Sequence, residues 1–380
     1  MAEAFFWLFA LAATYSYFIY PLLLWLAVRL RGSVAQPSPL GAELPALTLI
    51  VTVHNEEARI GAKLANVAAL DYPRERLQVI VASDASTDGT EAIVAAQAAQ
   101  GIELVRAGER LGKENAQLCA IRAARGEILV FSDVATGMPP EALRRLVAHF
   151  GDPAVGAVSS EDRFLSRDGA VAGEGLYVRY EMWLRRLESR LAGLVGLSGS
   201  FFAARRTVCE LWDIQSPSDF NTALNCARLG LRAVTAPDVL GYYQDLQDPA
   251  REYARKVRTV LRGMTGLARH TEVLDLRRHG WFAWQVIGHK LMRWLVPWAL
   301  AGLLFANACA LDAGAFYLLA MAGQVVFYAV AALAHWRPAL REAGPLRIVY
   351  FFVQVNLAIG DATRQFLAGR RMTVWQPSAR

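Results

Sequence analysis

Charged residues and cysteines are both scarce in this chain of 380 residues. Asp, Glu, Lys and Arg make up 19% of it, whereas hydrophobic residues make up 54% and the mean hydropathy is +0.25. These values are high for a purely soluble protein, and membrane-spanning segments are the natural explanation. The four cysteines lack the spacing of metal ligands, which indicates structural thiols in a reducing compartment.

Motifs that mark several other classes of protein are also missing. The chain has no phosphate-binding loop of the form G-x-x-x-x-G-K-[ST], no paired histidines and no Ser-His-Asp spacing, so those chemistries find no support. It has 40 Lys and Arg against 34 Asp and Glu, a net charge of +6, but no helix-turn-helix, zinc or basic-aromatic repeat. The positive charge therefore favours anionic membrane lipids as partners and gives no indication of nucleic acid binding.

The N-terminal segment is predicted to anchor the chain in a membrane. Residues 4–28 contain no charged side chain and are long enough to cross a bilayer. A signal peptide carries its positive charge first, whereas here Arg29 and Arg31 follow the apolar run. The positive-inside tendency places the next domain in the cytoplasm. We therefore expect a transmembrane anchor at 1–31 and a linker at 32–45.

The C-terminal part, 280–380, is predicted to hold further membrane helices. Two segments, 281–310 and 314–334, are apolar enough to span a bilayer. A last apolar segment at 346–363 is interrupted by polar residues and followed by arginines. Whether this segment crosses the membrane is left open by the sequence.

Between these parts, strand-like and helix-like patterns alternate, which predicts βαβ units and a mostly parallel α/β sheet in a domain at 46–250. Residues 174–195 predict a helix that either belongs to this domain or lies on the lipid surface. A basic amphipathic region follows at 251–279. The expected strands are 47–53, 77–82, 102–106 and 127–132, and the expected helices lie near 57–70, 88–100 and 113–125.

Two strand-like segments, LIVTVHNEE (49–57) and VIVASDASTDGT (79–90), stop abruptly in polar residues. Ligands of open α/β sheets bind outside the carboxyl ends of the strands, where Asp84 is well placed to hold a ribose or a nucleotide-bound cation. Both segments resemble the opening of the family 2 glycosyltransferases, with Ala85 in place of the usual glycine. The resemblance implies a Rossmann-like domain of the GT-A type, with His54, Glu56 and Asp84 in the nucleotide-sugar site.

A third strand-like segment in GEILVFSDVATGMPPEAL (126–143) ends at Asp133. In the family an Asp-x-Asp at this place binds a divalent metal on the diphosphate, and Mg²⁺ generally takes one or two carboxylates plus phosphate oxygens. Here Ala135 occupies the third position, so the resemblance implies a weakened Mg²⁺ or Mn²⁺ site at Asp133. An aspartate that only caps the next turn is the alternative. Lys113, in RLGKENA, resembles the family's Gly-Lys step in the nucleotide pocket. A solvated surface charge is the alternative for Lys113 and for Glu56.

The acceptor side is predicted from two later segments. GLSGSFFAARR (196–206) resembles the acceptor loop of the family, where Ser198 and Gly199 would contact the acceptor. A turn that serves only packing is the alternative. Asp219 and Phe220 in SPSDFNTALN match the second acid of the catalytic-base motif and the aromatic residue after it, whereas Ser218 replaces the first acid. Asp219 would take the proton of the acceptor hydroxyl. A plain helix cap is the alternative role of Asp219.

Residues 251–263 (REYARKVRTVLRG) place several cations on one helical face. Arg255 and Arg258 match the family's diphosphate-binding motif, but Thr259 stands where a tryptophan is expected. Because that tryptophan contacts the acceptor sugar in polymerising relatives, processive synthesis is not expected. A basic helix resting on anionic lipid is the alternative.

Together the motifs are similar to those of bacterial exopolysaccharide and cellulose-synthase-like glycosyltransferases. They imply an inverting, UDP-sugar-dependent enzyme of the bacterial inner membrane, multi-pass, with a cytoplasmic catalytic domain. Its acceptor would be a lipid, a lipid-linked sugar or a polysaccharide. The losses at Ala135, Ser218 and Thr259 leave one alternative, an inactive homologue that serves as a scaffold or export subunit.

Overall fold

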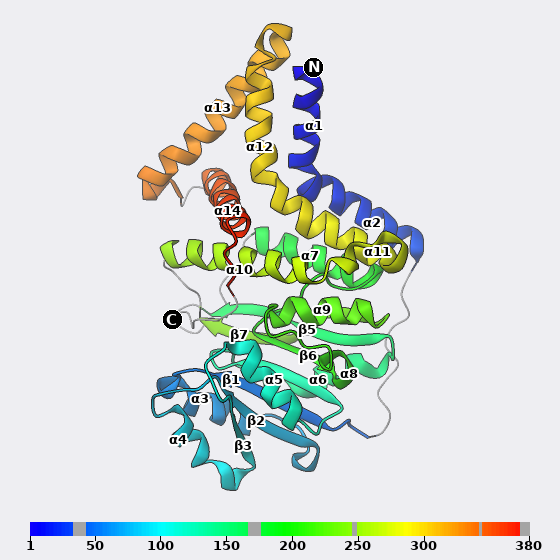
Figure 1. The fold of residues 1–380 in the computed structure, drawn as a ribbon, viewed down its shortest axis with the longest axis vertical. Helices are drawn as coiled ribbons and strands as arrows, with labels where there is room; N and C mark the ends of the chain where they lie inside the picture. Colours follow the sequence, from blue (N-terminus) through cyan, green and yellow to red (C-terminus); the bar gives the residue numbers. More distant parts are fainter. Residues whose placement is uncertain (33–42, 166–175, 245–248, 342–343, 373–380) are drawn as a thin grey trace. The chain divides into compact units, whose positions relative to one another are not determined.

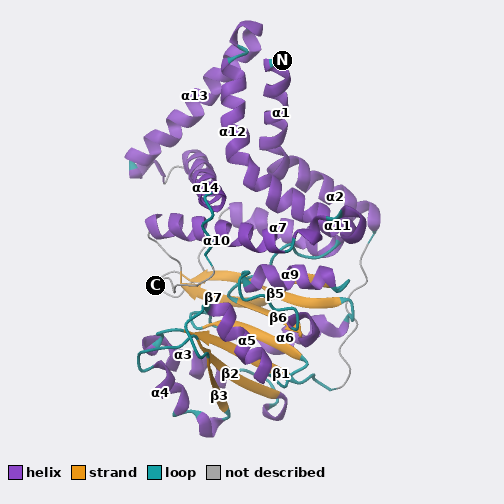
Figure 2. Cartoon of the chain, in the orientation of Figure 1, coloured by secondary structure: helices purple, strands orange, loops and turns teal. Residues whose placement is uncertain are grey.

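The computed structural model describes residues 1–32, 43–165, 176–244, 249–341 and 344–372. Most of the expected linker at 32–45 lies outside them. The chain forms two compact units, which differ in secondary structure (Figures 1 and 2). We call them the helical unit (Met1–Leu23, Gln247–Met264 and Val286–Arg371) and the sheet unit (Leu24–Leu246, Thr265–Gln285 and Met372–Arg380).

The sheet unit is built on seven strands in the order β3-β2-β1-β4-β6-β5-β7. Four neighbouring pairs are parallel, and only β6 runs against its neighbours β4 and β5. The predicted mostly parallel sheet is thus present. The reversal has a local cause: the turn before β6 lies at the carboxyl end of β4, where the Asp133 amide donates to the Ser200 carbonyl (2.9 Å). The strands are Leu47–Val53, Leu77–Ser83, Ile102–Arg106, Ile128–Asp133, Val155–Leu165, Phe201–Arg205 and Arg232–Gln244.

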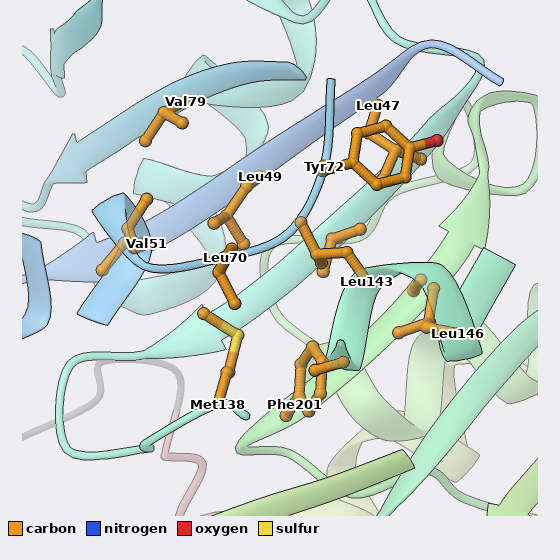
Figure 3. Packing of buried hydrophobic residues seen from close by; sticks show 14 of the residues in the cluster. Leu47, Leu49, Val51, Leu70, Tyr72, Val79, Met138, Leu143, Leu146 and Phe201 are labelled. Carbon is orange, nitrogen blue, oxygen red and sulfur yellow. The ribbon is translucent and has the colours of Figure 1, made fainter. Parts of the chain in front are cut away.

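Helices cover both faces of this sheet, so β1 is buried along its whole length. Leu47, Leu49 and Val51 point to one face, where they pack with Leu143 and Leu146 (Figure 3). That face is covered by α3 (Glu57–Ala68), α4 (Thr90–Ala95) and α6 (Ala142–Ala148). The opposite face is covered by α5 (Lys113–Ala123), α8 (Arg206–Cys209) and α9 (Ser218–Arg228).

The helix α7 (Leu176–Leu191) belongs to the sheet unit. Its residues Leu184, Leu187 and Leu191 are buried, and its Arg186 pairs with the buried carboxylate of Glu161 on β5 at 2.9 Å. Of the two alternatives left by the sequence, the structure therefore shows an internal helix. The same unit includes most of α11 (Leu276–Val286), whose Gln285 side chain donates to the Gly193 carbonyl (2.9 Å).

Three helical segments of the described chain are long and apolar enough to cross a membrane: Ala2–Arg31, Leu276–Ala308 and Ala315–Trp336. They correspond to the three expected spans. The first comprises α1 (Ala2–Thr14), a π-helical turn (Tyr15–Ile19) and α2 (Tyr20–Arg31). The second span includes α12 (Met292–Ala308), and the third is α13 (Ala315–Trp336). The other long helices are α10 (Pro249–Arg269) and α14 (Gly344–Leu367).

Within the helical unit, α1 packs closely along α12 (Figure 2). A Cβ atom at Gly302 would stand 2.7 Å from the ring of Phe9, and one at Gly288 would clash with the ring of Tyr20. Small residues let helix backbones and aromatic rings approach closely in this way. The two glycines therefore set the helix packing.

The basic helix α10 also has a protein partner in this unit. Its Val257 and Leu261 form a buried cluster with Ala358 and Ala362 of α14. The Lys256 ammonium lies 3.8 Å from the centre of the Phe351 ring, and burial lowers its pKa. Part of the apolar face of α10 is thus covered by α14.

In the sheet unit, Asp213 ties the loop before α9 to the end of α10. Arg269 donates to both of its carboxylate oxygens (2.6 and 3.2 Å), and the Ser216 hydroxyl adds a third bond at 2.8 Å. Burial opposes ionisation of Asp213, but these bonds and one from the Gln215 amide outweigh it and lower its pKa to about 2. His270 lies 3.2 Å from the same carboxylate.

We expect Asp213→Asn to lower the thermal unfolding midpoint at pH 7. Arg269 is 42% exposed, so screening limits the loss to about 1 kcal/mol. Because the folded-state pKa lies below the unfolded value of about 3.9, the stabilisation is present above that value and is lost as pH falls towards 2. The midpoints of the wild-type protein and the variant should converge between pH 4 and 2, measured by scanning fluorimetry. Asp71→Asn, which removes an exposed partner of Arg144, is the control and should change little at any pH.

Candidate functional site

The loops after β1 and β2 are joined by side chains of both segments. His54 Nδ1 lies 2.8 Å from the Asp84 carbonyl, and the Asn55 carboxamide oxygen accepts from the Thr87 amide at 2.8 Å. The Glu56 amide donates to the Thr90 hydroxyl (2.8 Å), and the Glu56 carboxylate pairs with Arg59 at 3.3 Å. The predicted residues His54, Glu56 and Asp84 therefore lie together at the carboxyl edge of the sheet.

Each of these loops turns through a left-handed backbone position. Asn55 has a φ of +53° and Ala85 has a φ of +51°. Asparagine tolerates this region, whereas an alanine there costs about 1–2 kcal/mol. The conformation explains why the family prefers glycine where this chain has Ala85.

Asp84 is 1% exposed and holds the loop that leads into α5. Its carboxylate accepts from the amides of Leu111 (3.2 Å) and Gly112 (3.0 Å). Gly112 has a φ of +105°, a conformation that favours glycine, and it directly precedes Lys113 at the helix start. Asp84 thereby fixes the position of Lys113.

The Lys113 ammonium is the centre of the site. It donates to Asp133 Oδ1 (2.6 Å) at the end of β4 and to the Gly199 carbonyl (2.9 Å) in the turn before β6. The Lys113 side chain is 9% exposed, whereas that of Asp133 is 31% exposed. The ion pair thus presents a partly open carboxylate edge beside a buried ammonium.

A second lysine, which the sequence analysis missed, lies behind Asp133. Lys63 of α3 is 3% exposed and donates to the Ser132 hydroxyl (2.7 Å) and the Thr136 carbonyl (2.6 Å). Burial lowers the pKa of Lys63 to about 7, although the Asp133 charge opposes the shift. Its signal in the sequence is weak, since a single lysine on an amphipathic helix normally faces solvent.

Asp133 fits a divalent cation as a single carboxylate ligand. Ala135 offers no side-chain oxygen, and within the described ranges no group of three His, Cys, Asp or Glu residues is arranged to hold a metal. Mg²⁺ can be bound through one carboxylate with substrate phosphates supplying further ligands. Lys113 already neutralises part of the Asp133 charge, so such a site is intrinsically weak.

The turn Ser198–Ser200 joins the two halves of the site. Its Gly199 carbonyl contacts Lys113, and its Ser200 carbonyl accepts from the Asp133 amide. On the other side, a Cβ at Gly199 would stand 3.3 Å from Asp219 Oδ2. The absence of a side chain at Gly199 therefore lets the Asp219 carboxylate approach the turn.

Asp219 lies in the first turn of α9 and is not the cap of that helix. The N-cap is Pro217, and Asp219 Oδ1 accepts from the amide of Phe220 (2.9 Å). The plain N-cap alternative is therefore corrected, because the N-cap is Pro217 and the helix starts two residues earlier than that alternative requires. Phe220 is 5% exposed and packs at Gly266, where a Cβ would stand 3.3 Å from its ring.

A buried carboxylate from α5 lies beside Ser218, where the family motif has its first acid. Glu114 Oε1 accepts from the Ser218 amide (3.3 Å), and the Glu114 carbonyl accepts from the Trp212 indole (3.0 Å). Glu114 is 1% exposed. The sequence gives only its position next to Lys113, and nothing in the spacing indicates that it meets a segment 104 residues later.

Arg255 and Arg258 belong to the helical unit, whereas the other predicted site residues belong to the sheet unit. Arg255 forms a two-point pair with Glu252 (2.8 and 2.9 Å). Burial and the neighbouring guanidinium groups of Arg262 and Arg255 lower the pKa of Arg258. These three arginines thus form one cationic cluster on α10, as the helical spacing predicted.

Comparison with known proteins finds a family match within the sheet unit. Residues 48–211 match the model described as Glycosyl transferase family 2. A β-monoglucosyldiacylglycerol synthase of Synechocystis sp. is 29% identical over 46% of this chain and 38% of its own length. An undecaprenyl-phosphate 4-deoxy-4-formamido-L-arabinose transferase of Aeromonas hydrophila is 36% identical over 28% of this chain and 33% of its own. The chain thus spans less than half the length of these relatives.

A solved structure matches almost the whole chain. It is a mannosyltransferase from Pyrobaculum calidifontis in complex with GDP-Man and Mn²⁺, 27% identical, with a TM-score of 0.75 over 98% of this chain and 100% of that one. It is a GT-A glycosyltransferase, in agreement with the mixed seven-stranded sheet. Residues 48–211 are therefore similar to the glycosyl transferase family 2 domain, in a chain that combines the GT-A fold with apolar helices long enough to cross a membrane.

Proposed function

We propose that this chain is an inverting glycosyltransferase that moves a sugar from a nucleotide-sugar to a lipid or lipid-linked acceptor. The observation that carries the proposal is the turn at Gly199. Its carbonyl accepts from Lys113 of the Lys113–Asp133 ion pair, and a Cβ at Gly199 would stand 3.3 Å from the Asp219 carboxylate. A donor diphosphate and an acceptor hydroxyl need these two kinds of group within a few ångströms of each other.

On the donor side, His54, Glu56 and Asp84 would line the nucleoside pocket, and Lys113 would neutralise the diphosphate. Arg255 and Arg258 would add positive charge as the glycosidic bond breaks and negative charge grows on the leaving group. A bound Mg²⁺ or Mn²⁺ at Asp133 would supply further charge neutralisation there. UDP is our proposed nucleotide, and the GDP-Man of the Pyrobaculum structure makes GDP the alternative to test.

On the acceptor side, Ser198, Gly199 and Phe220 would contact the acceptor, and Asp219 would act as general base. The acceptor oxygen attacks the anomeric carbon, its proton passes to the Asp219 carboxylate, and the nucleoside diphosphate leaves from the opposite face. One displacement of this kind inverts the anomeric configuration. It needs only one carboxylate, so the loss of the first acid at Ser218 is compatible with catalysis.

The acceptor and the location are inferred from the membrane helices and from the names of relatives. The three candidate spans and the basic charge favour catalysis at the cytoplasmic face of a bacterial inner membrane, next to anionic lipid. The Synechocystis and Aeromonas relatives are named for transfer to diacylglycerol and undecaprenyl phosphate, which supports a lipid acceptor over a growing polysaccharide. With Thr259 in place of an aromatic residue, one or very few sugars would be added per encounter.

The proposal is tested with the purified full chain in lipid nanodiscs and a panel of UDP-sugars and GDP-sugars. Diacylglycerol and undecaprenyl phosphate serve as acceptors, nucleoside diphosphate release is measured, and products are sized by mass spectrometry. We expect one donor to give a lipid carrying one or a few sugars. Failure of every donor would support the inactive scaffold, and a ladder of long polymers would contradict the non-processive mechanism.

We expect Asp219→Asn to reduce transfer by about 10²–10⁴-fold, because the amide cannot take the acceptor proton. Nucleoside diphosphate binding, measured by calorimetry, should stay at the wild-type value. Asp238→Asn is the matched control, since Asp238 lies on β7 and pairs with His149 (2.8 Å). A turnover of Asp219→Asn equal to that of this control would remove Asp219 from the mechanism.

Position 135 tests the metal site. We expect Ala135→Asp to tighten Mn²⁺ binding in the presence of nucleoside diphosphate by roughly tenfold, since it adds a second charged oxygen ligand beside Asp133. Ala135→Asn, which adds a neutral oxygen of the same size, should have a smaller effect. Calorimetric titration gives the order of affinities. Equal affinity in all three proteins would show that Asp133 does not hold the cation.

A further inference from the structure

The carboxylate of Asp162 on β5 binds the turn Ser198–Ser200. The Ser198 hydroxyl donates to this carboxylate (2.7 and 2.8 Å to its two oxygens), and the Ser200 hydroxyl donates to Asp162 Oδ1 at 2.7 Å. Tyr243 of β7 adds a further hydrogen bond. One carboxylate on a neighbouring strand thus holds both side chains that flank Gly199.

The position of Asp162 is prepared by the local strand geometry. Along β5 and β7 the register shifts between Ser160 and Glu161, where the partner changes from Ala236 to Leu240. Such irregularities re-aim side chains and are common next to active sites. Opposite Asp162 stands Gly241, where a Cβ would lie 3.7 Å from Asp162 Oδ1 and 3.2 Å from Thr136. The glycine leaves room for the carboxylate.

Glu161, which precedes Asp162 on the same strand, is a buried carboxylate with a structural role and can be compared with Asp162. It is 1% exposed, and its partners are Arg186 (2.9 Å) and Arg163 (3.5 Å). Successive side chains of a strand point to opposite faces, so Glu161 and Asp162 serve different surroundings. Glu161 has cationic partners, whereas Asp162 accepts from hydroxyl groups that belong to the site.

The cost of placing a carboxylate at this position also indicates a specific role. Burial raises the pKa of Asp162, although the hydrogen bonds from Ser198, Ser200 and Tyr243 and the charge of Arg185 oppose the shift. A serine or asparagine would satisfy one or two hydroxyl donors at a lower desolvation cost. A carboxylate instead gathers three donors on two oxygens and so fixes a turn that has a glycine at its centre.

We propose that Asp162 is a positioning residue for glycosyl transfer, which sets the Ser198–Ser200 turn and through it both Lys113 and Asp219. This inference rests on the proposed function, because the turn matters only if donor and acceptor meet there. Asp162 holds Ser198 and Ser200, and the Gly199 carbonyl between them holds Lys113. On the other side of Gly199, a Cβ would stand 3.3 Å from Asp219 Oδ2.

The test compares Asp162→Ala, Asp162→Asn and the double variant Ser198→Ala/Ser200→Ala. We expect Asp162→Ala to lower kcat by about 10²-fold, the usual effect of displacing a reacting group by about 1 Å. Asp162→Asn, which keeps an acceptor oxygen, should recover most of this loss. The double variant removes the same bonds from the other side and should fall to the same level. Adding Asp162→Ala to it should cause no further loss, since one set of bonds is removed only once.

Glu161→Gln is the matched control. It disturbs a buried ion pair on the same strand, so it should lower the thermal midpoint while kcat per folded molecule stays at the wild-type value. A kcat of Asp162→Ala within threefold of wild type, or losses that multiply when Asp162→Ala is added to the double variant, would overturn the proposal. If Asp162→Ala does not fold, Asp162→Asn and the double variant decide between the same outcomes.

A readout that does not depend on transfer separates this proposal from the proposed function. The Asp133 amide donates to the Ser200 carbonyl, so its hydrogen exchange reports whether the turn is in place. We expect exchange at Asp133 to accelerate at least tenfold in Asp162→Ala and to remain unchanged in Glu161→Gln. Unchanged exchange in Asp162→Ala overturns the positioning role. A wild-type protein that transfers no sugar while the exchange result holds contradicts only the proposed function.

Discussion

The ion pair between Lys113 and Asp133 is the contact on which the geometry of the site depends. Each partner is fixed by a different part of the sheet unit: Lys113 by the loop that Asp84 holds, and Asp133 by the end of β4 and by Lys63 behind it. Because the pair is partly shielded from water, its attraction is stronger than that of an exposed pair. The Gly199 carbonyl completes the arrangement, and the reversal of β6 follows from the position of this turn.

The fold was largely predictable from the sequence, and the reasons are local. The strand β1 begins and ends where its apolar run does, since buried parallel strands are nearly continuous runs of apolar residues. The three candidate spans were also predictable, because each apolar segment is long enough to cross a membrane. The sequence did not predict the direction of β6, because β6 pairs with residues of β4 that are far away in the chain.

Residues of the candidate site could be predicted from the sequence only where they lie at the ends of helices or strands. Asp84, Lys113, Asp133 and Asp219 each lie at a strand end or helix start, where a sequence pattern shows a boundary. Lys63 and Asp162 lie inside elements, and Glu114 follows Lys113 in the first turn of α5. The partners of all three belong to segments that are distant in the chain. Such residues resemble ordinary charged positions in a sequence and become recognisable only through burial and contacts.

The close packing of α1 on α12 bears on what the N-terminal helix is. A segment that merely held a soluble domain at a membrane would be exchangeable for any apolar helix of sufficient length. Here the rings of Phe9 and Tyr20 occupy the spaces left by Gly302 and Gly288, so the N-terminal segment and its neighbour have complementary shapes. The segment Met1–Leu23 is therefore an integral part of the helical unit, and a foreign anchor of equal hydropathy would leave two gaps the size of aromatic rings in it.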